Sequence, residues 1–145
     1  MFKQLLKTDD HLALFIIRVT PGLLILPHGA QKLLGLFGGY GFTATMSSFT
    51  SMGIPAFLAF LVIVTESIGA LLLLFGFTTR IWAGMLTAIM LTAIVNIHYA
   101  KGFLMTWAGT NAGEGLEYHL LVIGICIALI IKGAGRWSAD RQLTK

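Results

Sequence analysis

The chain has 145 residues, of which 57% are hydrophobic and only 11% are charged, and its mean hydropathy is +0.86. Soluble domains carry about 25% charged residues, so this composition excludes an ordinary soluble protein and predicts one membrane domain, residues 1–145, in a lipid bilayer. The net charge of +4 comes from basic residues at the ends of apolar runs, which indicates membrane topology and not nucleic-acid binding. The single cysteine, Cys126, excludes an internal disulfide.

The first predicted spanning helix covers residues 12–36. Because Arg18 interrupts its apolar run, we interpret it as a retained helix and not as a cleaved signal peptide. His28, Gln31 and Lys32 share one face of this helix, since residues three and four apart point the same way. Ionisable groups at membrane depth are costly, so we expect this face to be functional.

The rest of the chain predicts an all-α membrane fold. Residues 37–53 are rich in glycine, serine and threonine and predict a short interfacial helix. Further apolar runs predict spans over residues 54–77, 81–100 and 116–133. The predicted fold is therefore a four-transmembrane-helix bundle with an interfacial helix between helices 1 and 2. The excess of lysine and arginine on one side predicts that both termini are cytoplasmic.

Polar residues of three helices are expected at one depth. At about 1.5 Å per residue, His28, Asn96, His98 and Glu117 lie roughly 22–27 Å from the cytoplasmic end of their helices. Glu66, the only charge in the second span, is expected lower, near the midplane. In lipid such groups should face one another across the bundle interior, which predicts a polar layer.

Three charge pairings are compatible with these depths, and each has an alternative. Arg18 alternatively extends to the cytoplasmic surface, and Glu66 is alternatively a buried structural counter-ion. His119 points about 200° away from Glu117 around the helix, so we assign it to packing or to the membrane interface. The predicted ion pairs are Arg18 with Glu66, Lys32 with Glu117, and Arg80 with Asp140.

An ordered set of residues resembles the DoxX family from about residue 12 to residue 140. No single motif is specific, but the order of the whole set is. The set comprises Arg18, His28-Gly29-Ala30-Gln31-Lys32, Glu66 with Gly69 and Leu71 to Leu74, Gly76, Thr79-Arg80, His98 with Gly102-Phe103, Glu117-Tyr118, and the segment from Gly133 to Asp140.

The resemblance implies a four-helix bacterial inner-membrane protein. Members of this family are linked to sulfur and quinone redox and to redox stress, and a related subunit belongs to a thiosulfate:quinone oxidoreductase. The resemblance implies an oxidoreductase component. No metal site is predicted. The implied catalytic candidates are His28, Lys32, Glu66, His98 and Glu117, and the candidates for cofactor binding are Gln31 and Asn96.

The first functional hypothesis is a quinone-like small molecule bound in the polar layer. His28, Lys32 and His98 can donate hydrogen bonds to its carbonyls, and Glu66 or Glu117 can relay protons. Because the chain has no flavin or nucleotide fingerprint, electrons must come from a separate redox partner protein. The alternatives are a haem held by His28 and His98, a small-molecule or proton transporter, and a non-enzymatic membrane scaffold.

Overall fold

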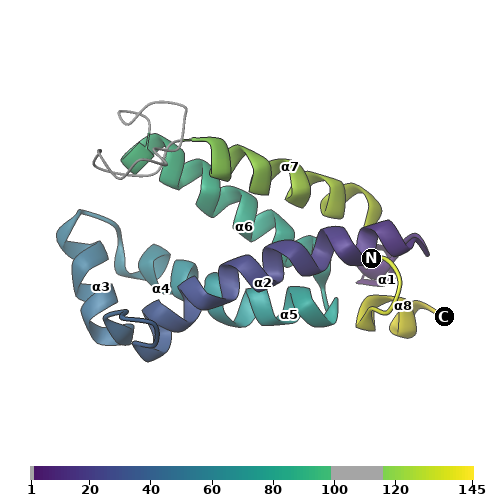
Figure 1. Ribbon diagram of the computed structural model, residues 1–145, viewed down its shortest axis with the longest axis horizontal. Coiled ribbons are helices and arrows are strands. Elements are labelled where there is room, and N and C mark those ends of the chain that lie inside the picture. Colours follow the sequence, from purple (N-terminus) through teal and green to yellow (C-terminus); the bar gives the residue numbers. More distant parts are fainter. Residues whose placement is uncertain (1, 99–115) are drawn as a thin grey trace.

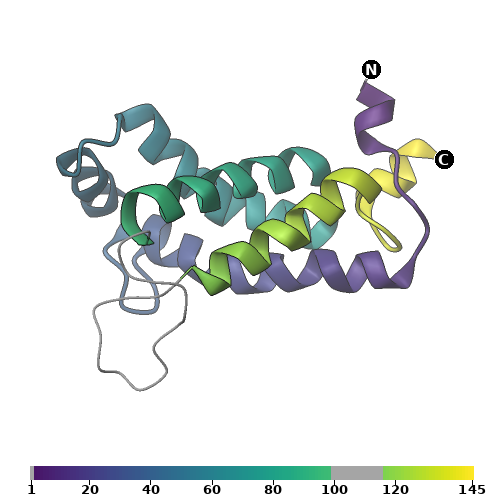
Figure 2. The ribbon, with the colours of Figure 1, turned by 90° about the horizontal axis from the view of Figure 1, so that it is seen from above.

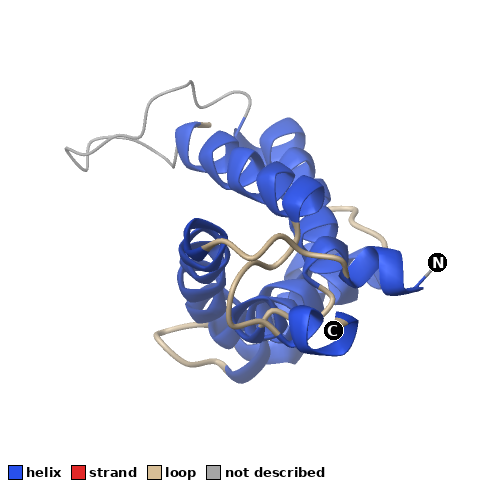
Figure 3. Cartoon of the chain, turned by 90° about the vertical axis from the view of Figure 1, so that its right-hand side faces the viewer, coloured by secondary structure: helices blue, strands red, loops and turns tan. Residues whose placement is uncertain are grey.

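The structure, a computed structural model, describes residues 2–98 and 116–145. Within these two ranges every regular element is a helix and no strand occurs, which confirms the predicted all-α class (Figure 3). The elements in chain order are α1 (Phe2–Leu6), α2 (Leu12–Leu34), α3 (Gly41–Ser51), α4 (Ala56–Val64), η1 (Thr65–Gly69), α5 (Ala70–Phe75), α6 (Thr79–Ala93), η2 (Ile94–His98), α7 (Glu117–Lys132) and α8 (Ala139–Thr144). The elements η1 and η2 are π-helical turns.

Three helical stretches of the described chain are long and apolar enough to cross a membrane: Leu12–Leu34, Ala56–Phe75 and Thr79–Asn96. They overlap the first three predicted spans, although the predicted end at residue 100 lies outside the described residues. The fourth predicted span corresponds to α7, which has 16 residues. At about 1.5 Å per residue α7 is roughly 24 Å long, shorter than a hydrocarbon core of about 30 Å.

The long helices form two layers. In one layer α2 packs against η1 and α5, and in the other α6 packs against α7. Figure 1 shows α2 running along the length of the molecule, with α5 on one side and the α6–α7 pair on the other. Helix α7 also contacts α2, and Figure 2 shows α7 running obliquely to both α2 and α6. Both layers supply the core, which includes Ile25, Leu73, Leu86, Cys126 and Leu129.

The connection between α5 and α6 is fixed by a buried arginine. Arg18 is fully buried, and its guanidinium donates hydrogen bonds to the carbonyl oxygens of Leu73 at 3.0 Å, Leu74 at 2.8 Å and Trp137 at 3.2 Å. The first two carbonyls belong to the last turn of α5, where the helix dipole places partial negative charge. Gly76 ends this helix with a φ of 67°, the left-handed conformation usual at a helix C-terminus.

This arrangement corrects the predicted Arg18–Glu66 ion pair. Helix α2 runs antiparallel to the 56–75 stretch, as Figure 1 shows, so Arg18 lies beside Leu73 and Leu74. Glu66 lies further along, opposite Gly29. The two residues are therefore separated along the bundle axis, and main-chain carbonyls take the place of the carboxylate as acceptors for Arg18.

Asp140, in α8, binds the first turn of α6. Its carboxylate accepts hydrogen bonds from the backbone N–H groups of Thr78 at 2.6 Å and Thr79 at 2.9 Å. The predicted Arg80–Asp140 ion pair is corrected accordingly. Asp140 reaches the expected connection, but it satisfies free N–H groups at a helix N-terminus. The Arg80 guanidinium donates instead to main-chain carbonyls of α1 and α7.

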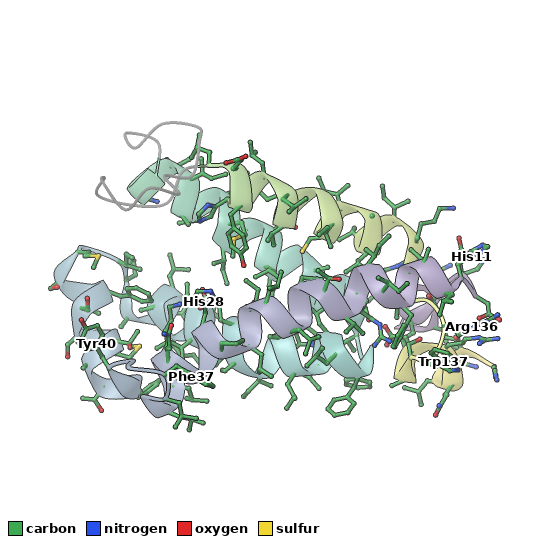
Figure 4. All side chains as sticks on the ribbon, in the orientation of Figure 1. His11, His28, Phe37, Tyr40, Arg136 and Trp137 are labelled. Atoms are coloured by element: carbon green, nitrogen blue, oxygen red, sulfur yellow. The ribbon has the colours of Figure 1, made fainter. Side chains whose placement is uncertain are left out.

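The contacts of Arg18 and Asp140 define one end of the bundle. We call it the clamped end, and it comprises the α5–α6 connection and residues 133–145. The carboxylate of Asp10 pairs there with Arg136, at 3.2 Å, and with Arg141. Both chain termini lie at this end in Figure 1, and Figure 4 labels His11, Arg136 and Trp137 there.

Replacing Asp140 with asparagine is expected to lower the free energy of unfolding by about 2 kcal/mol. The change weakens two hydrogen bonds to a charged acceptor and its interaction with the α6 dipole. It also loosens Thr78, whose φ of 50° is unfavourable for a β-branched residue. Thermal unfolding of the purified protein in detergent measures the effect.

The matched control is Asp9→Asn, which removes an exposed ion pair of 3.2 Å between Asp9 and Lys132. Exposed ion pairs contribute about 0–1 kcal/mol, so this variant should unfold close to the wild type. An equal loss of stability in the two variants would contradict the role of Asp140 as a helix cap.

Candidate functional site

A cavity of about 440 Å³ lies between the two helix layers, away from the clamped end. Most of its wall is apolar and comes from α2, α4, α6 and α7, with Phe49 of α3 at one side. Small-molecule sites in proteins have volumes of about 300–1,000 Å³, apolar walls and few polar groups. The polar lining residues are His28, Lys32, Thr65, Glu66, Thr92, Asn96, Tyr118 and His119.

The cavity opens to the surface of the described chain, because several of its lining residues are exposed. His28, Thr92 and Asn96 are exposed although they line it. Figure 4 shows His28 near the end of α2 that lies toward α3, and the labelled Phe37 and Tyr40 follow beyond it. The termini lie at the opposite end of the molecule. The site is thus accessible at the end of the bundle that the C-terminal tail does not fix.

Direct backbone contact between α2 and η1 shapes one wall of the cavity. A Cβ atom built on Gly29 would overlap the carbonyl group of Glu66 and the backbone nitrogen of Ser67. Both neighbours are main-chain atoms of a helix and have little room to move, so this position requires glycine. The segment that Gly29 contacts is a π-helical turn, an irregularity that is frequent at functional sites.

Lys32 and Glu66 form an ion pair across this contact. The Lys32 side chain is 24% exposed and the Glu66 side chain only 8% exposed, so the carboxylate is the more deeply placed partner. The predicted pairing of Lys32 with Glu117 is corrected accordingly. The predicted depth of Glu66, below His28, is also wrong, because the contact with Gly29 brings Glu66 close to the level of His28. The ammonium group has three donors, so two remain for a ligand.

Four of the seven predicted site residues line the cavity together: His28, Lys32, Glu66 and Asn96. The amide nitrogen of Asn96 donates to the carbonyl of Thr92 at 2.9 Å. Two predicted residues lie outside the lining. The amide of Gln31 donates to the carbonyl of Phe37 at 3.1 Å and fixes the loop after α2, and Glu117 is exposed at the start of α7. The side chain of His98 lies outside the described part of the structure.

Four polar lining residues, Thr65, Thr92, Tyr118 and His119, were not among the predicted site residues. His119 is only 5% exposed and faces the cavity, where we had expected packing or the membrane interface. Helical spacing could have predicted that His119 faces the bundle interior, because it lies three and four residues before the core residues Val122 and Ile123. Thr65 directly precedes Glu66, but no sequence pattern indicated the π-helical turn that holds both.

The fold and this cavity define a class: a helical membrane protein with an open, mostly apolar cavity between two helix layers. The family model for DoxX matches residues 13–99, more than half of the chain and most of the cavity wall. The chain belongs to the DoxX family, which confirms the resemblance read from the sequence.

Curated relatives agree with this assignment. The chain is 29% identical to "Putative oxidoreductase CatD" of Bacillus subtilis (strain 168) over 114 residues, which cover 79% of this chain and 75% of the relative. It is 30% identical to "Inner membrane protein YqjF" of Escherichia coli (strain K12) over 141 residues, 97% of this chain and 98% of the relative. An uncharacterized membrane protein of Mycobacterium tuberculosis is 32% identical over 98% of this chain and 88% of its own length. No solved structure matches the chain.

Proposed function

We propose that this protein is the ligand-binding membrane component of an oxidoreductase system and that its cavity binds a quinone-like small molecule. The observation that carries the proposal is the open apolar cavity of about 440 Å³ with the Lys32–Glu66 ion pair in its wall. Apolar walls accommodate a flat ring, and a few convergent donors orient its carbonyls. The name of one relative, "Putative oxidoreductase CatD", supports the same class of function.

The lining residues suit the proton part of quinone chemistry. Reduction of a quinone to a quinol adds two electrons and two protons to its carbonyl oxygens. Lys32 donates a hydrogen bond to one carbonyl, and Glu66 and His28 exchange the protons. A separate redox partner protein supplies the two electrons. The ligand's two carbonyls therefore lie within reach of the wall formed by α2 and η1.

The proposal includes a membrane topology with four spans. Helix α7 packs along α6, buries Val122, Cys126 and Leu129 inside the bundle, and exposes Leu121 and Ile131. An apolar outer surface on a helix beside a spanning helix suits contact with lipid. In this topology α3 lies at the membrane interface, and both termini are on the cytoplasmic side of the inner membrane.

Binding of menadione, an uncharged naphthoquinone, to the purified full chain tests the proposal. We expect saturable binding by isothermal titration calorimetry in detergent. The double variant Lys32→Gln/Glu66→Gln should bind about tenfold more weakly, because a hydrogen bond from a charged group contributes about 1.5–3 kcal/mol. Changing both partners leaves no uncompensated charge in the bundle.

The matched control is the double variant Asp9→Asn/Lys132→Gln, which removes an ion pair at the clamped end. It should bind menadione as the wild type does. Absence of saturable binding to the wild type would refute the proposed function. Equal binding to the wild type and the Lys32/Glu66 double variant would remove this ion pair from the site.

A further inference from the structure

Four hydroxyl groups, three in α2 and α6 and one in η1, donate their hydrogen bonds in the same way. Each donates to the main-chain carbonyl four residues earlier, the usual solution for serine and threonine inside membrane helices. The distances are 2.9 Å for Thr20 to Ile16, 2.5 Å for Ser67 to Ile63, 2.8 Å for Thr87 to Ala83 and 2.8 Å for Thr92 to Ala88.

Thr65 departs from this pattern. Its side chain is buried, with 2% of the residue exposed, yet its Oγ1 has no hydrogen-bond partner among residues 2–98 and 116–145. Thr65 is the first residue of the π-helical turn, and Ser67 in the same turn keeps its hydrogen bond to Ile63. The hydroxyl of Thr79 is also buried without a partner among the described residues, but Thr79 begins α6 and does not line the cavity. An unpaired buried hydroxyl is unfavourable, so a retained one needs an explanation.

Thr65 also lines the cavity, next to Glu66 on the same wall. We propose that the Thr65 hydroxyl donates a hydrogen bond to a carbonyl oxygen of the bound ligand. This inference rests on the proposed function, and it adds a binding residue and a requirement on the ligand. The ligand must carry a hydrogen-bond acceptor that reaches the wall beside the Lys32–Glu66 pair.

The same wall indicates that the ligand is uncharged. Among residues 2–98 and 116–145 one lysine and one carboxylate line the cavity, and their formal charges cancel in the Lys32–Glu66 pair. The other titratable lining residues are His28, Tyr118 and His119. An anion would bring a charge without a free counter-ion into a mostly apolar site, which is costly. A neutral carbonyl compound meets both requirements.

The inference is tested by pairing a change in the protein with a change in the ligand. Menadione has two ring carbonyls, and 2-methylnaphthalene has a similar shape without them. The wild type should bind menadione more tightly than 2-methylnaphthalene. Thr65→Val keeps the shape of the side chain and removes the donor, so it should lose about tenfold in menadione affinity and none for 2-methylnaphthalene.

Two control variants separate the hydroxyl from its surroundings. Thr65→Ser retains a donor and should bind menadione within about twofold of the wild type. Thr87→Val also removes a hydroxyl, but one that donates to Ala83 and does not line the cavity, so it should leave menadione binding unchanged. If the wild type binds no menadione, the proposed function fails and this inference with it.

If the wild type binds menadione and Thr65→Val binds it equally well, only the role of Thr65 is overturned. An equal loss of menadione affinity in Thr87→Val would also overturn the role of Thr65. If Thr65→Val does not fold, Thr65→Ser tests the role of the hydroxyl instead. The serine variant should bind menadione more tightly than 2-methylnaphthalene, as the wild type does, and equal affinity for the two compounds would overturn the inference.

Discussion

Replacement of Lys32 with methionine is expected to lower the free energy of unfolding by about 3–5 kcal/mol. The change leaves the Glu66 carboxylate, 8% exposed, without its ion-pair partner inside an apolar bundle. Breaking a buried pair by removing one partner is strongly destabilising, because the remaining charge stays desolvated. Unfolding of the purified protein in detergent, followed by circular dichroism, measures the loss.

A second variant separates two contributions to the free energy of unfolding: the penalty for an unpaired Glu66 carboxylate and the stabilisation that the ion pair provides. The double variant Lys32→Met/Glu66→Gln carries no charge at this site, and it should regain most of the stability lost in Lys32→Met. Similar stability of Lys32→Met and the wild type would mean that water entering through the cavity solvates Glu66. The ion pair would then contribute to ligand binding and not to the fold.

Replacement of Gly29 with alanine is expected to lower the free energy of unfolding by about 3 kcal/mol, and to weaken ligand binding as well. The added methyl group overlaps main-chain atoms of Glu66 and Ser67, so α2 and the π-helical turn must separate. Separation moves Lys32 and Glu66 relative to each other and widens the cavity. Melting temperature and menadione affinity are the two measurements.

Gly124→Ala is the matched control for this prediction. Gly124 lies in α7, and a Cβ atom built on it meets no atom within 4 Å. Alanine is favoured over glycine in a helix interior by about 0.5–1 kcal/mol, so this variant should be as stable as the wild type or slightly more stable. Wild-type stability in Gly29→Ala would show that α2 and η1 do not pack as closely as the structure has them.

Hydrophobic pattern and helical spacing predicted much of the fold. The first three spans follow from long apolar runs, and the face of His28 and Lys32 follows from their spacing of four residues. Depth counted along each helix also placed Asn96 near His28, and both line the cavity. Each of these features depends on residues within one helix, so it can be predicted from the sequence of that helix alone.

Contacts between helices could not be predicted in the same way. The predicted partners of Arg18 and Asp140 were charged side chains, but both residues bind main-chain groups at helix ends, which have no signature in a sequence. The pairing of Lys32 with Glu66 depends on the approach that Gly29 permits. The burial of an unpaired Thr65 hydroxyl in the cavity wall depends on how neighbouring helices pack, which no residue pattern specifies. Each error concerned rotation or register between neighbouring helices.

The clamped end has a consequence for how the family can diversify. Arg18 and Asp140 hold the two helix ends of the α5–α6 connection, far from Thr92 and Asn96 in the cavity wall. Changes in the exposed wall residues therefore leave the anchoring contacts intact. A protein built this way can acquire a different ligand through a few substitutions at one end without a matching loss of stability at the other. Its relatives need not share a substrate in order to share this architecture.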